Sequence, residues 1–425
     1  MKLSDEDKRM LDGGRGEGTA LAMRIVVRMA SVQQADELMD VTAAHIDGCG
    51  LLSEVGVAFA ERLVSGGARV RVPTTLNMGP LDLKNWRAFD VPKDFAEMAI
   101  RQGRAYEAMG CVPTWTCAPY QGYLTPRFGQ QIAWGESNAI IYANSVLGAR
   151  TNRYGDYIDI CAAITGRVPK CGLHLTENRR GQVLLRLVDI TDEVLSSEAF
   201  WPAMGHLLGP AAGERIPVID ALPANATDDQ LKALGAAAAS SGGVALFHAV
   251  GLTPEAPTLE AAFGGRRPEE TIDIRQADLD AALADLSTVA DEGQAIDAVV
   301  LGCPHFSFAE FVELARLIEA EPGRTVAPGV TFIVATGESS HALAARSPNL
   351  DVIRDFGGRI TLDTCVFHCP IIPPEAKVIM TNSGKCSYYA PGELGVEVVF
   401  GSLADCVRSA ATGGVCRSAS PWTSD

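Results

Sequence analysis

The sequence predicts an α/β protein of several domains, with mainly parallel sheets flanked by helices. From Val244 onward, short apolar runs of β-forming residues alternate with segments of helical periodicity, which is typical of a parallel sheet. The chain has 425 residues, enough for two or three ordinary cores, and 47% of them are hydrophobic. A globular α/β architecture follows from these observations.

The C-terminal half supplies the clearest elements. Residues 295–305 form an apolar run that predicts a strand ending at Gly302. Ser307 and Glu310 have the spacing of a capping box, so a helix is expected to begin there. Further strands are expected in three later apolar runs, at residues 331–338, 358–365 and 377–385.

The N-terminal half is expected to be more helical. Residues 90–109 begin with an Asp cap, carry a Pro in the first turn and present one apolar face, so they predict a helix that ends at Gly110. Residues 111–153 are rich in Thr, Asn, Tyr, Trp, Gly and Pro and show little periodicity. Such a stretch is either a surface loop or a functional one.

Changes in composition predict the domain boundaries. Residues 209–229 contain three prolines and little periodicity, which indicates a crossover, and a second boundary is expected near residues 339–349. The expected parts are an N-terminal α/β domain (1–210), a central α/β domain (211–345) and a C-terminal segment that packs back on the others (346–425).

Charge and hydropathy exclude several classes of partner. The chain has 36 Lys and Arg against 52 Asp and Glu, a net charge of −16, and no basic run, so a nucleic-acid partner is not expected. The first twelve residues lack the pattern of a secretory or transit peptide. The most apolar long stretch, 235–252, is interrupted by polar residues, so we expect a cytoplasmic protein without a membrane span.

The 11 cysteines are expected to be reduced thiols, because their number is odd and no export signal is visible. Three of them, Cys117, Cys303 and Cys365, lie in a polar loop or at the ends of expected strands, where α/β proteins collect ligands. Three thiolates suit an iron–sulfur cluster with one open iron, or a mononuclear iron, whereas no zinc spacing is present. The alternative is that all the cysteines are packing residues.

Several sequence blocks resemble the large subunit, or catalytic domain, of aconitase X. The similarity extends from residues 45–50 to residues 400–407. The most specific blocks are PTWTCAPY (113–120), FGQQIAWGESNAIIYANSVLGARTNR (128–153), LGCPHFS (301–307), LDTCVF (362–367) and VIMTNSGKCSYYAPG (378–392). The resemblance implies a dehydratase of the aconitase superfamily, with α/β domains around an iron centre held by Cys117, Cys303 and Cys365.

The resemblance also implies the reaction and a partner. Members of this family dehydrate cis-3-hydroxy-L-proline, mainly in bacteria, or mevalonate 5-phosphate, mainly in archaea. The Ala- and Arg-rich composition favours the first substrate, which would give Δ1-pyrroline-2-carboxylate, while Arg127, Arg150 and Arg153 could serve a phosphate. The family uses a small swivelling domain, fused or separate, and this chain resembles only the large part, so a small swivelling subunit is the implied partner. An iron–sulfur regulatory or binding protein is the alternative of another class.

Dehydration requires a base, a Lewis acid and groups that hold the carboxylate of the substrate. The expected catalytic residues are Lys385 and Ser383, in the TNSGK motif, and His45. Lys385 could instead be a solvated surface lysine, and His45 a core histidine. The expected substrate-binding residues are polar side chains of the matching loops: Asn77, Glu136, Ser137, Asn138 and Asn152. His305 and Asp82 are further candidates, with packing or capping as their alternative roles.

Overall fold

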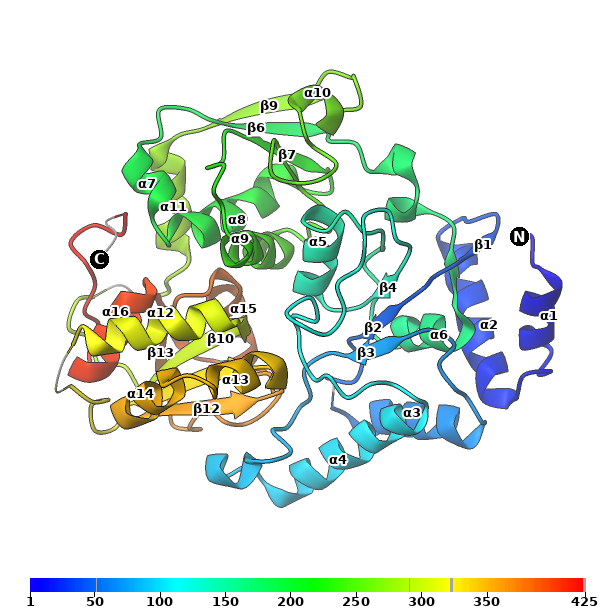
Figure 1. Ribbon diagram of the computed structural model, residues 1–425, viewed down its shortest axis with the longest axis horizontal. Coiled ribbons are helices and arrows are strands. Elements are labelled where there is room, and N and C mark those ends of the chain that lie inside the picture. The colour runs from blue at the N-terminus through cyan, green and yellow to red at the C-terminus, as the bar shows by residue number, and fades with distance from the viewer. Residues whose placement is uncertain (51, 290, 322–323, 423–425) are drawn as a thin grey trace. The chain divides into compact units, whose positions relative to one another are not determined.

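The computed structural model describes residues 1–50, 52–289, 291–321 and 324–422, and the chain forms two compact units (Figure 1). Unit 1 consists of Met1–Arg180 and Asp363–Cys369, and unit 2 consists of Gly181–Leu362 and Pro370–Asp425. Both units contain parallel sheets and helices, which confirms the predicted α/β class. The three domains expected from the sequence stay a prediction.

A small parallel sheet organises unit 1. Its strand order is β3-β2-β4, and its strands are β2 (Ala44–Ile46), β3 (Thr74–Leu76) and β4 (Ala133–Trp134). All residues of these strands are buried, as expected for a parallel sheet covered on both faces. A separate antiparallel pair joins β1 (Leu38–Asp40) to β5 (Arg167–Pro169).

Helices supply most of the remaining core of unit 1. Met23 and Val26 of α2 share one hydrophobic cluster with Ile160 and Ile164 of α6. The helices are α1 (Asp5–Leu11), α2 (Glu17–Val32), α3 (Glu54–Ser65), α4 (Lys93–Ala108), α5 (Ser137–Ser145) and α6 (Ile158–Thr165), with short 3₁₀ turns η1 (Trp86–Phe89), η2 (Gly172–His174) and η3 (Thr176–Asn178).

Unit 2 contains a five-stranded parallel sheet of order β12-β11-β10-β13-β14. The strands are β10 (Ala298–Phe306), β11 (Thr331–Thr336), β12 (Gly358–Leu362), β13 (Val378–Thr381) and β14 (Glu397–Phe400). The helices that accompany them are α12 (Phe308–Glu319), α13 (Glu338–Ala344), α14 (Asn349–Phe356), α15 (Gly384–Leu394) and α16 (Leu403–Thr412). Side chains of β10, β11, α12, α14 and α16 form one hydrophobic cluster.

A second parallel sheet in unit 2 has the order β8-β7-β6-β9. The strands are β6 (Val183–Leu187), β7 (Pro217–Asp220), β8 (His248–Ala249) and β9 (Glu270–Ile274), and the helices are α7 (Asp192–Ser196), α8 (Phe200–Ala212), α9 (Asp228–Ser241), α10 (Leu259–Ala262) and α11 (Gln276–Asp285). Helices α8 and α9 pack closely because Gly205 faces the backbone of α9. A Cβ atom there would lie 2.2 Å from the Leu234 carbonyl oxygen.

The structure confirms the capping box and corrects two predicted boundaries. Ser307 and Glu310 exchange both capping bonds at the start of α12. The predicted strand end at Gly302 is wrong, because β10 bulges and pairs again with β11 through Phe306. The predicted helix 90–109 begins later, at Lys93, because Asp90 adopts a left-handed conformation that ends η1.

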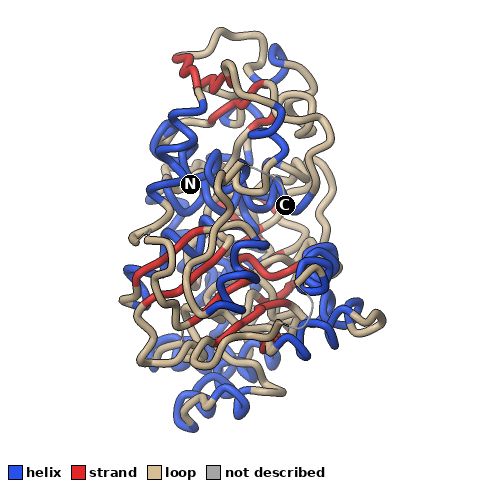
Figure 2. Tube along the Cα trace, turned by 90° about the vertical axis from the view of Figure 1, so that its left-hand side faces the viewer, coloured by secondary structure: helices blue, strands red, loops and turns tan. Residues whose placement is uncertain are grey.

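Long loops connect many of these elements (Figure 2). Within the polar stretch 111–153 the structure has only β4 and α5 as a strand and a helix. Among the helices of the described residues, none combines the length and apolar character that crossing a membrane requires.

Candidate active site

The carboxyl edge of the β3-β2-β4 sheet gathers polar residues in unit 1. The three strands are parallel, so the residues that follow them meet at one edge. Asp47 follows β2, Asn77 follows β3 and Glu136 follows β4 by two residues. The Asn77 side-chain amide donates a hydrogen bond to Asp47. The structure thus brings the predicted residues Asn77 and Glu136 to one sheet edge and adds Asp47, which the sequence analysis missed.

His45 lies on β2 and is completely buried. Its Nδ1 atom is 2.8 Å from the Thr75 hydroxyl, and its ring lies against Trp134 with 5.6 Å between centroids. Burial lowers the pKa of His45 to about 4, although the charge of Glu136 opposes this shift. At neutral pH the imidazole is therefore uncharged and can act through hydrogen bonding, not as a cation.

The WGESN motif shapes the start of α5. Glu136 has a positive φ of 68° and caps the helix, accepting a hydrogen bond of 2.6 Å from the Ala139 backbone and one of 3.3 Å from Ser137 Oγ. Asn138 is fully buried and donates to the Cys117 carbonyl oxygen at 3.1 Å. Asn138 therefore holds the loop that carries Cys117.

Cys365 belongs to unit 1 through the short segment Asp363–Cys369. The Gly79 backbone N–H donates to the Asp363 carbonyl at 2.6 Å, and the Cys365 N–H donates to the Gly79 carbonyl at 3.4 Å. The Cys365 sulfur accepts a hydrogen bond of 3.4 Å from the Phe367 backbone N–H. The two predicted iron ligands of unit 1, Cys117 and Cys365, are thus positioned by loops that follow or contact the same sheet.

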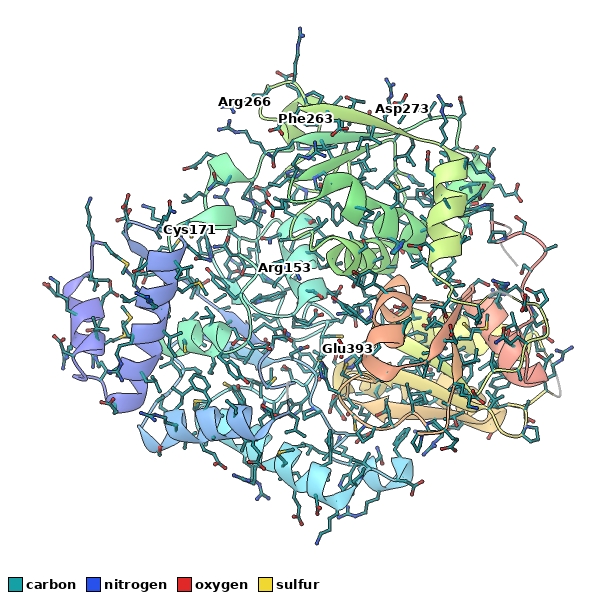
Figure 3. The ribbon with its side chains drawn as sticks, turned by 180° about the vertical axis from the view of Figure 1, so that it is seen from behind. Arg153, Cys171, Phe263, Arg266, Asp273 and Glu393 are labelled. Atoms are coloured by element: carbon teal, nitrogen blue, oxygen red, sulfur yellow. The ribbon has the colours of Figure 1, made fainter. Side chains whose placement is uncertain are left out.

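Asn152 is engaged by a neighbouring loop. Its amide oxygen accepts from the Leu173 N–H at 2.7 Å, and its amide nitrogen donates to the Cys171 carbonyl at 3.2 Å. Arg150 donates to the Thr176 hydroxyl at 2.7 Å, whereas Arg153 is exposed (Figure 3). In this structure Asn152 and Arg150 therefore contribute to loop packing.

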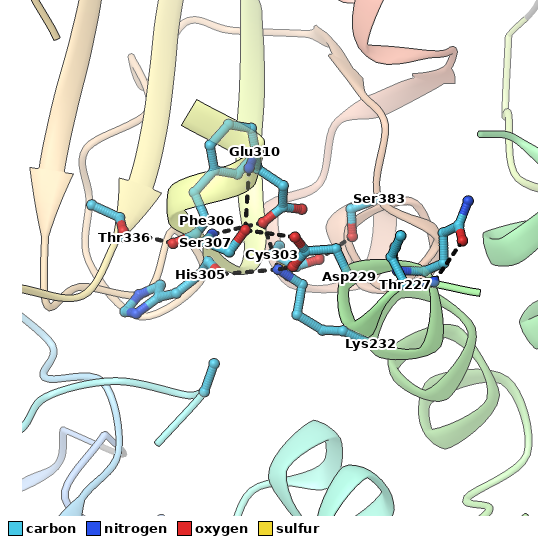
Figure 4. A network of polar contacts seen from close by, with 12 residues as sticks. Thr227, Asp229, Lys232, Cys303, His305, Phe306, Ser307, Glu310, Thr336 and Ser383 are labelled. Carbon is cyan, nitrogen blue, oxygen red and sulfur yellow. Dashed lines mark hydrogen bonds and ion pairs between the residues drawn. The ribbon is translucent and has the colours of Figure 1, made fainter. Parts of the chain in front are cut away.

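Unit 2 contains a pocket of about 470 Å³ at the carboxyl ends of two adjacent strands. Cys303 lies near the end of β10, and Ser383 follows β13 by two residues. The Ser383 hydroxyl donates to the Cys303 carbonyl and accepts from the Cys386 N–H at 3.0 Å, which caps α15 (Figure 4). Residues that line the pocket include Lys232, Gly302, Cys303, Glu310, Asn382 and Ser383.

A buried ion-pair cluster borders this pocket, and the sequence analysis did not identify it. The Lys232 side chain is 2% exposed, and its Nζ atom lies 2.8 Å from Asp229 and 2.5 Å from Glu310 (Figure 4). Nζ also donates to the carbonyl oxygen of His305, a buried residue of β10, at 3.4 Å. Lys232 thereby connects α9 to the strand that carries Cys303.

The cluster shifts the titration of its members. Burial alone would lower the pKa of Lys232, but the charges of Glu310 and Asp229 raise it above its ordinary value. Burial raises the pKa of Glu310 to about 7, against the opposing effect of Lys232. The burial of Lys232 was not predictable from local sequence, because a Lys three residues after an Asp on a helix is typical of an exposed ion pair.

Two other candidate site residues from the sequence, Lys385 and Asp82, lie at or shortly before the starts of helical elements. Lys385 is the second residue of α15, is partly buried, and is not among the described residues that line the pocket. Asp82 is buried and caps the turn before η1, since its Oδ1 accepts from the backbone N–H groups of Lys84 at 2.9 Å and Asn85 at 2.8 Å. Asp82 thus has the capping role that was its alternative.

All eleven cysteines lie in the described part of the chain, and none of them is in a disulfide there. Burial raises the pKa of several thiols well above the ordinary range, which keeps them protonated: Cys49, Cys111, Cys161 and Cys406. Cys303 and Cys365 are only partly buried, and Cys117 is buried in its loop. Cys303 and Cys365 thus combine partial exposure with a position near a strand end, which suits a metal ligand.

The metal site itself stays a prediction. Cys117 and Cys365 lie in unit 1, and Cys303 lies in unit 2. Within either unit, the described residues include no group of three His, Cys, Asp or Glu side chains placed to hold a metal ion.

Comparison with known proteins gives concordant matches along the chain. Family models match for the aconitase X first domain over residues 1–177, the second domain over 181–284 and the third domain over 296–412. The cis-3-hydroxy-L-proline dehydratase of Pseudomonas aeruginosa is 44% identical over 100% of this chain and 72% of that protein. The phosphomevalonate dehydratase large subunit of Methanothermobacter thermautotrophicus is 36% identical over 96% of this chain and 98% of that protein.

A solved structure is similar throughout. The crystal structure of Thermococcus kodakaraensis aconitase X, in its holo-form, has a TM-score of 0.86 and 31% identity. The match covers 96% of this chain and 100% of that one.

Proposed function

The chain belongs to the aconitase X family of hydro-lyases, and we propose that it is the large, catalytic part of a cis-3-hydroxy-L-proline dehydratase. The observation that carries the proposal is the 44% identity over the whole chain to a protein of that name, against 36% to a phosphomevalonate dehydratase large subunit. The reaction is loss of water from cis-3-hydroxy-L-proline, which leads to Δ1-pyrroline-2-carboxylate.

A second polypeptide completes the proposed enzyme. The chain spans 72% of the Pseudomonas aeruginosa dehydratase but 98% of the archaeal large subunit. Because the archaeal relatives are named large subunits, we assign a small swivelling subunit as the partner. We propose the cytoplasm as the location, since thiols such as the proposed iron ligands persist there in reduced form.

We assign the iron centre, an iron–sulfur cluster or a mononuclear iron, to Cys117, Cys303 and Cys365. When bound, it supplies a Lewis acid that polarises the departing hydroxyl group. Asn138 and Ser383 are positioning residues in this scheme, since each donates a hydrogen bond to the carbonyl of a proposed ligand, Cys117 or Cys303.

The other proposed residues act on the substrate. Neutral His45 is a hydrogen-bonding group for the leaving hydroxyl, and Lys385 is the cation for the carboxylate. Asn77, Glu136 and Ser137 shape the sheet edge near His45. Asn152 supports this region indirectly by fixing the loop at Cys171.

The test is reconstitution of the large chain with the small subunit under anaerobic conditions, with iron supplied. We expect dehydration of cis-3-hydroxy-L-proline by the complex and none by either chain alone. Turnover of mevalonate 5-phosphate in place of hydroxyproline would assign the enzyme to the second substrate class. Absence of both activities in an iron-loaded complex would favour a binding or regulatory protein.

A further inference from the structure

The carboxyl edge of the β3-β2-β4 sheet contains more hydrogen-bond acceptors than donors. Asp47 accepts a hydrogen bond from the Asn77 amide nitrogen and is hydrogen-bonded to the Asp156 carboxyl group. Asn77 is completely buried, and its amide oxygen receives no hydrogen bond from the described residues. A buried acceptor without a donor is rare in folded proteins and indicates a missing partner.

The backbone around these acceptors is fixed. The buried Asp159 carboxylate accepts from the backbone N–H groups of Asp47 at 2.5 Å and Gly48 at 3.3 Å. Gly135 packs against Asp47 so closely that a Cβ atom there would lie 2.6 Å from the Asp47 Cβ. Asp47 is therefore held in place by Asp159 and by Gly135, so its position does not depend on a loose surface loop.

The local charge is consistent with a missing cation. Burial raises the pKa of Asp156, and the opposing effects of His368 and of the Asp47 hydrogen bond do not cancel this shift. Burial also raises the pKa of Asp159 to about 7. Burial therefore disfavours the ionised form of these two carboxyl groups, and a bound cation would stabilise that form.

We propose that Asp47, Asp156 and Asn77 bind the ring ammonium group of a cyclic amino acid substrate. A secondary ammonium has one positive charge and two N–H donors, so it can satisfy the carboxyl pair and the Asn77 oxygen at once. A metal ion fits less well, because the described residues offer no group of three suitable ligands.

This inference rests on the proposed function and extends it to substrate selection. A phosphorylated hydroxy acid has no ammonium group, and its negative charge is repelled by two aspartates. The acceptor group of Asp47, Asp156 and Asn77 would therefore select cis-3-hydroxy-L-proline over mevalonate 5-phosphate.

Calorimetric titration of the complete two-subunit protein tests the inference with two ligands of nearly equal shape, L-proline and tetrahydrofuran-2-carboxylate. The second has an oxygen in place of the ring nitrogen and cannot be cationic there. We expect L-proline to bind at least tenfold more tightly to the wild-type protein. Asp156→Asn, which changes a partly exposed residue, should reduce this ratio to about twofold or less, and Asp47→Asn should act similarly. Asp5→Asn, with a fully exposed side chain, is the matched control and should retain the ratio.

The outcomes separate this inference from the proposed function. Equal binding of both ligands by a complex that dehydrates cis-3-hydroxy-L-proline would overturn the ammonium site and leave the function intact. A preference for L-proline that Asp156→Asn abolishes, in a complex without dehydratase activity, would support the site and reject the function. Thermal unfolding of each variant identifies any that fails to fold. If Asp47→Asn does not fold, the ratio of the two affinities in Asp156→Asn tests the ammonium site.

Discussion

The Nζ atom of Lys232 lies 2.5 Å from Oε2 of Glu310 inside unit 2, at the border of the pocket that Cys303 lines. Because the same lysine also pairs with Asp229 and donates to the His305 carbonyl, it links helix α9 to strand β10. A buried cation in this position is required mainly by the charges around it, since two carboxylates would otherwise face each other without compensation.

Replacement of this cation should therefore destabilise the protein strongly. Lys232→Met keeps a similar chain length but removes the charge, and we expect a loss of about 3–5 kcal/mol in the free energy of unfolding. Urea denaturation of the full chain measures it. Lys8→Met, at a site that is 59% exposed, is the control and should change stability by less than about 0.5 kcal/mol. A Lys232→Met effect as small as that of the control would contradict the role assigned to the cluster.

Asp159 should make stability depend on pH. Its pKa is about 7 in the folded protein, against an ordinary value of 3.8, so the folded state retains a proton that the unfolded state releases between these values. The contribution of this group is complete below the ordinary pKa and is lost as the pH rises through 7. Relative to Asp159→Asn, which stays neutral, the wild-type protein should lose roughly 3–4 kcal/mol of stability between pH 4.5 and pH 8.

Denaturation curves of both proteins across this pH range provide the measurement for Asp159. Asp5→Asn, which alters an exposed carboxylate, should follow the wild-type curve. If wild type and Asp159→Asn changed in parallel with pH, the raised pKa would be wrong.

Cysteine variants should separate iron ligands from packing residues. Cys303→Ser is expected to abolish iron binding and activity, whereas Cys416→Ser, at a cysteine outside the proposed ligand set, should retain both. Anaerobic iron and sulfide analysis, with electron paramagnetic resonance, compares them directly. Equal iron content in the two variants would show that Cys303 is a packing residue and not an iron ligand.

Ser383 should matter for activity beyond its cap. Ser383→Ala removes the cap of α15 and the hydrogen bond to the Cys303 carbonyl, while Ser402→Ala removes only the comparable cap of α16. Each should cost about 1 kcal/mol of stability. Only Ser383→Ala should lower kcat, by about tenfold or more, because it alone releases the strand end that carries Cys303. Similar kinetics for the two variants would leave Ser383 with a capping role alone.

Local sequence patterns predicted the structure correctly where the residues that determine an element lie close together in the sequence. Ser307 and Glu310 define the start of α12 within four residues, and both capping bonds form as expected. Strands β10, β11 and β13 are mainly apolar runs, so their alternation with helices predicted the α/β class. The resemblance then assigned the three proposed iron ligands from short motifs.

The remaining features depend on tertiary packing that local patterns do not contain. Lys232 appears in sequence as one member of an ordinary helical ion pair, and only the approach of Glu310 makes it a buried cation. Asp47 follows a strand of three residues, too short for a periodicity signal, and its partner Asp156 lies far along the chain. Asn152 carries no sign that its amide will be fixed by the loop at Cys171.

The most direct measurement is the rate of cis-3-hydroxy-L-proline dehydration by the anaerobically reconstituted two-subunit complex, compared with mevalonate 5-phosphate at equal concentration. We expect Δ1-pyrroline-2-carboxylate formation that requires both chains and is lost in Cys303→Ser, with no turnover of the phosphorylated substrate. Dehydration of mevalonate 5-phosphate without hydroxyproline turnover, or full hydroxyproline turnover by the large chain alone, would contradict this expectation.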